Sequence, residues 1–99
     1  MSAGYVGIMS VDLHFPESGS LKTKRKDIQS AKAQLSRRFG AAVAEVDYHD
    51  LWQRSRITMT CVAREYQGVN ELLDGAEQYL WSQSFTVGAV DKDVIKVGE

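Results

Sequence analysis

The chain has 99 residues, of which 43% are hydrophobic and 25% charged, and its formal net charge is −1. This length and composition predict one globular domain over residues 1–99 and exclude a disordered chain, while the lack of any apolar run near 18 residues argues against a membrane partner. One cysteine excludes an intramolecular disulfide and the N-terminus lacks the pattern of a signal peptide, so we expect a cytoplasmic protein.

The first half of the chain shows a strand and then a long helix. Alternating apolar and polar residues predict a strand over 5–15, followed by a turn that begins at Pro16. A helical period predicts a helix over 21–39. Ser20 suits the N-cap of that helix, and Gly40 suits its C-terminal stop.

The second half predicts three strands and a second helix. Strands are expected over 41–47 and 54–64, a helix over 67–82, and a last strand over 86–97 with Gly88 as a candidate bulge. The order β-α-β-β-α-β predicts an α+β, ferredoxin-like two-layer sandwich. Its antiparallel sheet should have strand order 4-1-3-2, with both helices on one face.

The charges are unevenly distributed along the chain. Residues 22–38 hold seven basic residues and one acid, a local balance of +6, whereas the remainder balances at −7. An exposed basic stripe on the first helix could follow a phosphate backbone, and the helix start at 18–20 could hold a phosphate. The candidate RNA- or phosphate-binding residues are Ser20, Lys22, Arg25, Lys26, Lys32 and Arg37.

Two simpler interpretations of the basic helix remain open. Its charges could form an ordinary solvated surface. They could also balance the acids of the second helix, which should lie beside the first on the same layer; these acids are Glu71, Asp74 and Glu77.

A polar cluster is expected on the sheet face turned away from the helices. It comprises Asp12, His14, Glu45 and Arg56. An Asp, a His and a Glu close together could bind a divalent metal or move a proton. An open sheet offers no enclosed cavity, however, so solvent-facing residues paired with Arg56 are the simpler interpretation.

The stretch 44–54 concentrates ionisable and aromatic side chains at the connection between two strands. We expect Leu51 and Trp52 to fold back over one end of the core. The alternative is a contact loop for a partner, because tryptophan and arginine are enriched at interfaces. Its candidate residues are His49, Asp50, Trp52 and Arg54.

The outward positions of the two central strands bear on the mode of binding. Ferredoxin-like domains that read single-stranded RNA on the sheet place aromatic residues there. Here these positions are expected to hold Ser10, Asp12, Thr58 and Thr60, so RNA contact should come from the first helix instead. The outward apolar residues Val6, Ile8 and Val62 would suit a sheet-to-sheet homodimer.

Three stretches resemble the YlxP-like family of small bacterial proteins of unknown function: residues 13–16, residues 20–25 and residues 44–54, the last including His49-Asp50-Leu51-Trp52-Gln53-Arg54. The resemblance implies a ferredoxin-like fold and no established reaction. Members are often encoded near translation factors, which implies a role around RNA or the ribosome. Residues 46–48 depart from the glycine-bearing turn of that family.

Three hypotheses follow, in order of preference. The first is a non-catalytic binding protein that contacts RNA or a ribosomal particle through the basic helix. The second is a protein–protein adaptor or homodimer that uses the open sheet face and the Trp52 loop. The third is a small metal-dependent enzyme around Asp12, His14, Glu45 and His49. No catalytic residue, metal or cofactor is assigned, and no signal indicates sequence-specific DNA binding.

Overall fold

The computed structural model describes residues 3–16 and 19–98. Every predicted element is present, with boundaries within one residue of the prediction. The elements are β1 (Tyr5–His14), α1 (Leu21–Phe39), β2 (Ala42–Asp47), β3 (Arg54–Ala63), α2 (Tyr66–Trp81) and β4 (Thr86–Lys96).

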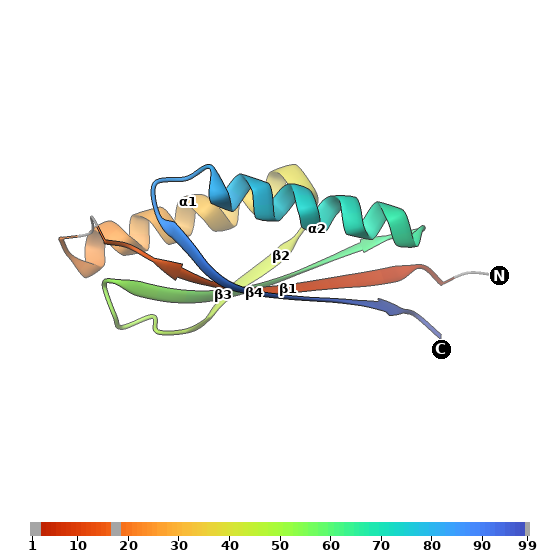
Figure 1. Cartoon of the computed structure of the whole chain (residues 1–99), viewed down its shortest axis with the longest axis horizontal. Helices are drawn as coiled ribbons and strands as arrows, with labels where there is room; N and C mark the ends of the chain where they lie inside the picture. Colours follow the sequence, from red (N-terminus) through yellow and green to blue (C-terminus); the bar gives the residue numbers. More distant parts are fainter. Residues whose placement is uncertain (1–2, 17–18, 99) are drawn as a thin grey trace.

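The four strands form one antiparallel sheet in the order β2-β3-β1-β4, and both helices cover the same face of it (Figure 1). The predicted ferredoxin-like α+β fold and strand order are therefore confirmed. β1 and β4 change register between Val11 and Leu13, where Gly88 and Ala89 lie opposite Asp12. The predicted bulge at Gly88 is thus present.

The core lies between the sheet and the helices, and alternation along the central strands builds it. Buried core residues of the two central strands face buried residues of both helices; these are Met9, Val11, Leu13, Ile57, Met59, Ile28, Leu35, Val69, Leu73 and Leu80. Gly7 allows α2 to approach closely, since a Cβ there would lie 2.6 Å from Val69 Cγ1. An alanine at position 7 would therefore force the helix away from the sheet.

Both predicted ends of α1 are formed by their expected caps. The Ser20 hydroxyl accepts a hydrogen bond from the Thr23 amide at 3.2 Å. Gly40 adopts a left-handed conformation with φ of 64°, and its amide donates to Ser36 O at 3.0 Å. Neither helix of the described chain has the length and apolarity to cross a bilayer.

Candidate functional site

The buried stripe of α1 begins with a charged residue. Lys24 has no exposed surface and lies in line with Ile28 and Leu35. Its Nζ donates to the Tyr48 carbonyl at 2.6 Å and lies 3.1 Å from Glu45 Oε2. A buried ammonium needs such partners, because losing its hydration is costly.

The same carboxylate oxygen has a second donor. Ser55 is fully buried, and its hydroxyl donates to Glu45 Oε2 at 2.5 Å. Lys24, Glu45 and Ser55 thus join α1, β2 and β3 beneath the β2–β3 loop. Sequence reasoning did not find this cluster. The sequence did contain one signal for the burial of Lys24: it lies four residues before Ile28, which places both residues on the same side of a helix.

The prediction that Glu45 lies on the open sheet face is wrong. β2 pairs with β3 so that Glu45 is opposite Ile57, and the Ile57 side chain points to the helices. Residues directly opposite in an antiparallel pair share a face of the sheet. Glu45 therefore lies on the opposite face of the sheet from Asp12 and His14, and the three residues do not form a common site.

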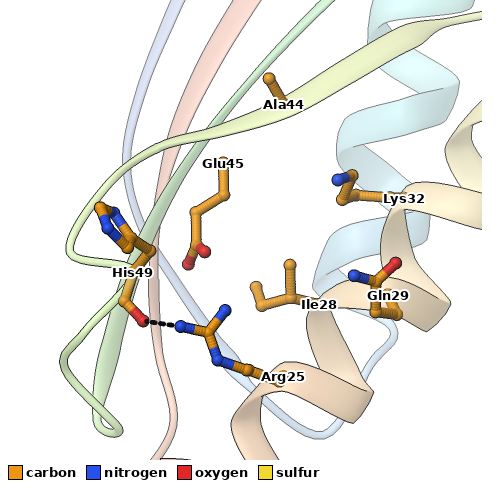
Figure 2. Close-up of a pocket in the computed structure, with 7 residues that line it drawn as sticks. All are labelled: Arg25, Ile28, Gln29, Lys32, Ala44, Glu45 and His49. Atoms are coloured by element: carbon orange, nitrogen blue, oxygen red, sulfur yellow. Dashed lines mark hydrogen bonds between the residues drawn. The ribbon is translucent and has the colours of Figure 1, made fainter.

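A cleft of about 320 Å³ opens between α1 and the edge strand β2 (Figure 2). Arg25, Gln29 and Lys32 line it from the helix, while Glu45 and His49 line it from β2 and the loop that follows. Arg25 Nη2 donates to the His49 carbonyl at 3.2 Å, which ties the helix to the loop across the mouth of the cleft (Figure 2). The charge of Glu45 is offset by Lys24, and Arg25 and Lys32 supply positive charge along the helix side of the cleft.

The remaining cations of α1 extend this cleft into a basic face. At about 100° per residue, its members fall within an arc of roughly 140° on the side away from the core. We define the basic face as Lys22, Arg25, Lys26, Lys32 and Arg37. In the described part of the chain, the one carboxylate within ion-pair distance of this face is Asp50, at 3.9 Å from Arg25 Nη2.

Two acids of α2 form ion pairs with β4 and not with the basic face. Asp74 and Glu77 both pair with Lys92 of β4, at 3.0 Å and 2.5 Å. The hydrogen bond from Lys92 lowers the pKa of the Glu77 carboxyl below its ordinary value. Among the described residues, no ion pair links α1 to α2, so the acids of α2 make no direct pair with the basic face.

The Ser20 side chain at the start of α1 already has a structural role as the N-cap of the helix. The Ser20 hydroxyl is engaged by the Thr23 amide and lies 3.0 Å from the Thr23 hydroxyl. Ser18, which belongs to the expected phosphate-binding start at 18–20, lies outside the described residues. Arg38 lies off the basic face, with its guanidinium 5.1 Å from the centre of the Tyr79 ring.

The open sheet face carries an ionic cluster centred on Asp12. Arg56 donates to Asp12 Oδ1 at 3.0 Å and to Asp91 Oδ2 at 2.9 Å, and Arg54 Nη2 lies 3.5 Å from Asp12 Oδ2. Partial burial acts to raise the pKa of the Asp12 carboxyl. The hydrogen bond and charge of Arg56, with those of Arg54, outweigh burial and lower that pKa. The expected pairing of Asp12 with Arg56 is confirmed, and His14 is exposed at the same end.

Asp12→Asn is expected to lower the free energy of unfolding by about 1–2 kcal/mol at pH 7, because two arginines lose their charged acceptor. The folded-state pKa of Asp12 is depressed, so its contribution is complete above the unfolded value near 3.8 and disappears as pH falls through the lower folded value. Urea unfolding at pH 7 and pH 3 should show a smaller difference between variant and wild type at pH 3. An equal difference at both pH values would contradict the assignment.

The expected contact residues occupy both sides of one tight loop. The Leu51 amide donates to the Tyr48 carbonyl at 3.0 Å, which closes a turn around His49 and Asp50. Trp52 is 42% exposed and Leu51 50% exposed. The prediction that these two side chains close one end of the core is therefore wrong.

Tyr48 is held in an unusual conformation at the start of this loop. Its φ of 61° is the one positive value at a non-glycine residue in the described chain. A tyrosine in this left-handed region costs roughly 1–2 kcal/mol. The Arg54 guanidinium lies 4.0 Å from the Tyr48 ring centre, and the Tyr48 carbonyl accepts from Lys24. These contacts fix the loop that walls the cleft.

Residues 6–91 match the model of the family described as "Protein of unknown function (DUF503)". The chain belongs to this family. The match covers both central strands, both helices and the cleft, and it brings no reaction or ligand with it. No curated protein matches the chain.

Solved structures with the same fold are distant in sequence. A VAO-type flavoprotein from Myceliophthora thermophila C1 matches 94% of this chain with a TM-score of 0.57 and 16% identity, but the chain spans only 16% of that protein. The designed protein Foldit4 matches over 90% of this chain and 96% of its own, with a TM-score of 0.53 and 9% identity. A C-terminal segment of the aIF2 alpha subunit from Pyrococcus abyssi matches 94% of this chain and 51% of its own, with a TM-score of 0.50 and 13% identity. These similarities support the ferredoxin-like fold alone.

Proposed function

We propose that this protein is a non-catalytic RNA-binding protein of the cytoplasm, and that the phosphate backbone lies along the basic face of α1 and enters the cleft beside β2. The observation that supports this most is the availability of the basic face. Lys22, Lys26, Lys32 and Arg37 have no ion pair within the described residues. The resemblance to the YlxP-like family, with members often encoded near translation factors, agrees with an RNA or ribosomal partner.

The cleft adds geometry to this charge. The Arg25 guanidinium is oriented by the His49 carbonyl, and Gln29 offers an amide donor between Arg25 and Lys32 along the same side of the helix. Arginine and lysine beside a hollow suit phosphate oxygens, which accept charge-assisted hydrogen bonds. Asp50 competes for Arg25, although its carboxylate is 83% exposed and at 3.9 Å is a weak partner.

Equilibrium binding of a labelled single-stranded RNA over a salt series tests the proposal. If the four cations without ion pairs contact phosphates, the slope of log K against log salt should be near −3, from about −0.7 per contact on single strands. Absence of measurable binding at low salt would contradict the proposed function. A slope near zero would contradict the electrostatic mode.

A second candidate function is self-association through the open sheet face. Val6 lies opposite Val62 on β3 and opposite Ile95 on β4, so an apolar row crosses three strands. Val62 is 66% exposed and Ile95 is 47% exposed. Burying this row against a second copy would remove apolar surface from water. Sedimentation equilibrium should then give a dimer mass, and a monomer at high protein concentration would contradict this candidate.

A further inference from the structure

The β2–β3 loop presents an exposed indole beside a second hollow. In the described chain, Trp52 has neither a hydrogen bond nor a ring partner, and the residue is 42% exposed. The other exposed tryptophan differs, since Trp81 Nε1 donates to Glu77 at 3.0 Å. Large aromatic side chains on a surface lose contact energy unless something packs against them. Trp52 therefore offers exposed aromatic surface that lines the hollow and has no ring partner among the described residues.

The hollow beside Trp52 has a size and lining that suit one planar ring system. Its volume is about 280 Å³, and His14, Leu51, Gln53 and Arg54 line it with Trp52. This is just below the roughly 300–1,000 Å³ typical of sites for drug-sized ligands. Unpaired bases stack on aromatic rings and on guanidinium planes, and both are present here.

Arg54, which lines this hollow, is held in place by two contacts. Arg54 stacks on Tyr48 at 4.0 Å and its Nη2 lies 3.5 Å from Asp12 Oδ2. The loop itself is attached to α1, because Lys24 holds the Tyr48 carbonyl and Arg25 holds the His49 carbonyl. A stacking surface on a fixed loop loses little conformational entropy when it binds.

The hollow and the basic cleft are two sides of the same loop. His49 lines the cleft and Trp52 lines the hollow. They are three positions apart in the chain, so their Cα atoms lie no more than about 11 Å apart. A nucleic-acid strand with a phosphate at Arg25 and His49 therefore has a neighbouring base within reach of Trp52. In a duplex the bases are stacked inside and could not use this surface.

We propose that the hollow around Trp52 holds an unpaired nucleobase of the RNA strand whose phosphates contact the basic face, so that the protein prefers single-stranded to double-stranded RNA. This inference rests on the proposed function and specifies its ligand. Non-specific single-strand binding commonly combines a cationic groove with a stacking aromatic side chain.

The test compares wild type, Trp52→Ala and the matched control Trp81→Ala. Both tryptophans are exposed, so neither substitution should disturb the core. Thermal unfolding of each variant verifies that it is folded. The probes are a labelled single-stranded RNA 12-mer and the duplex of the same sequence. Trp52→Ala should weaken single-strand binding about 5- to 150-fold, from the usual stacking contribution per base, and leave duplex binding and the salt slope unchanged. Trp81→Ala should behave as wild type.

A spectroscopic measurement separates stacking from a general effect on the loop. Trp81→Phe leaves Trp52 as the single tryptophan, and Trp52→Phe leaves Trp81. Single-stranded RNA should quench the fluorescence of the first variant and not of the second. Two outcomes would overturn this inference and leave the proposed function in place, provided that wild type binds RNA. In the first, Trp52→Ala binds single-stranded RNA as well as wild type does. In the second, Trp52→Ala loses affinity for single strands and duplex equally. Wild type that binds no RNA at low salt would overturn both the inference and the proposed function.

Discussion

Lys24→Met should lower the free energy of unfolding by about 3–5 kcal/mol, the cost of leaving one member of a buried ion pair without its partner. Methionine fills most of the space of the lysine side chain, so the loss of stability would come from the missing ammonium group more than from a cavity. The variant leaves the Glu45 carboxylate, which is 12% exposed, with Ser55 as its remaining donor. It also leaves the Tyr48 carbonyl without its ammonium donor.

Urea unfolding of Lys24→Met beside the control Lys26→Met measures this effect. Lys26 is exposed two positions along the same helix, and its replacement should change stability by less than about 0.5 kcal/mol. Adding Glu45→Met to Lys24→Met should recover much of the loss, because no unpaired buried charge then remains. Equal stability of the Lys24 and Lys26 variants would show that the buried pair does not support the fold.

Lys22→Glu combined with Lys26→Glu should weaken RNA binding by at least about 100-fold near 0.1 M salt. The change removes two cations that contact phosphate in the proposed complex, and two anions repel the strand in their place. The slope of log K against log salt should also become shallower, by about 0.7 for each contact removed. Both side chains are exposed and have no ion pair in the described chain, so stability should change little.

A control with the same change in formal charge separates a local effect from a global one. Arg64→Glu, Gln67→Glu and Gln78→Glu together add as much negative charge on and beside α2, where all three residues are exposed. The control should retain most of the wild-type affinity. If it loses as much binding as the α1 variant, net charge rather than the basic face governs association.

The fold followed from sequence because local signals agreed with one another. Alternation in β1 and β3, the Ser20 cap and the Gly40 stop each mark a boundary through backbone chemistry that needs no knowledge of distant residues. The strand order followed from the rules that govern β-α-β-β-α-β connections. The basic face could be predicted for the same reason, since it is a property of one helix.

The cleft could not be predicted in the same way, because it depends on pairing between elements. β2 alternates small residues with Val43 and Glu45, and neither face is clearly apolar, so only its register with β3 determines where Glu45 points. Lys24 contributed only to the local charge balance of residues 22–38, because its buried position depends on partners that β2 and the loop supply. The exposure of Trp52 likewise depends on a loop conformation that no local pattern specifies.

An NMR titration of isotope-labelled protein with the single-stranded RNA 12-mer tests directly whether the basic face and its cleft bind RNA. The amide signals that shift should belong to α1 around Arg25, Gln29 and Lys32, and to the loop at His49. The signals of Val62 and Ile95 on the open sheet face should not move. RNA-dependent shifts confined to the open sheet face, or no shifts at all, would contradict the claim that the basic face and its cleft bind RNA.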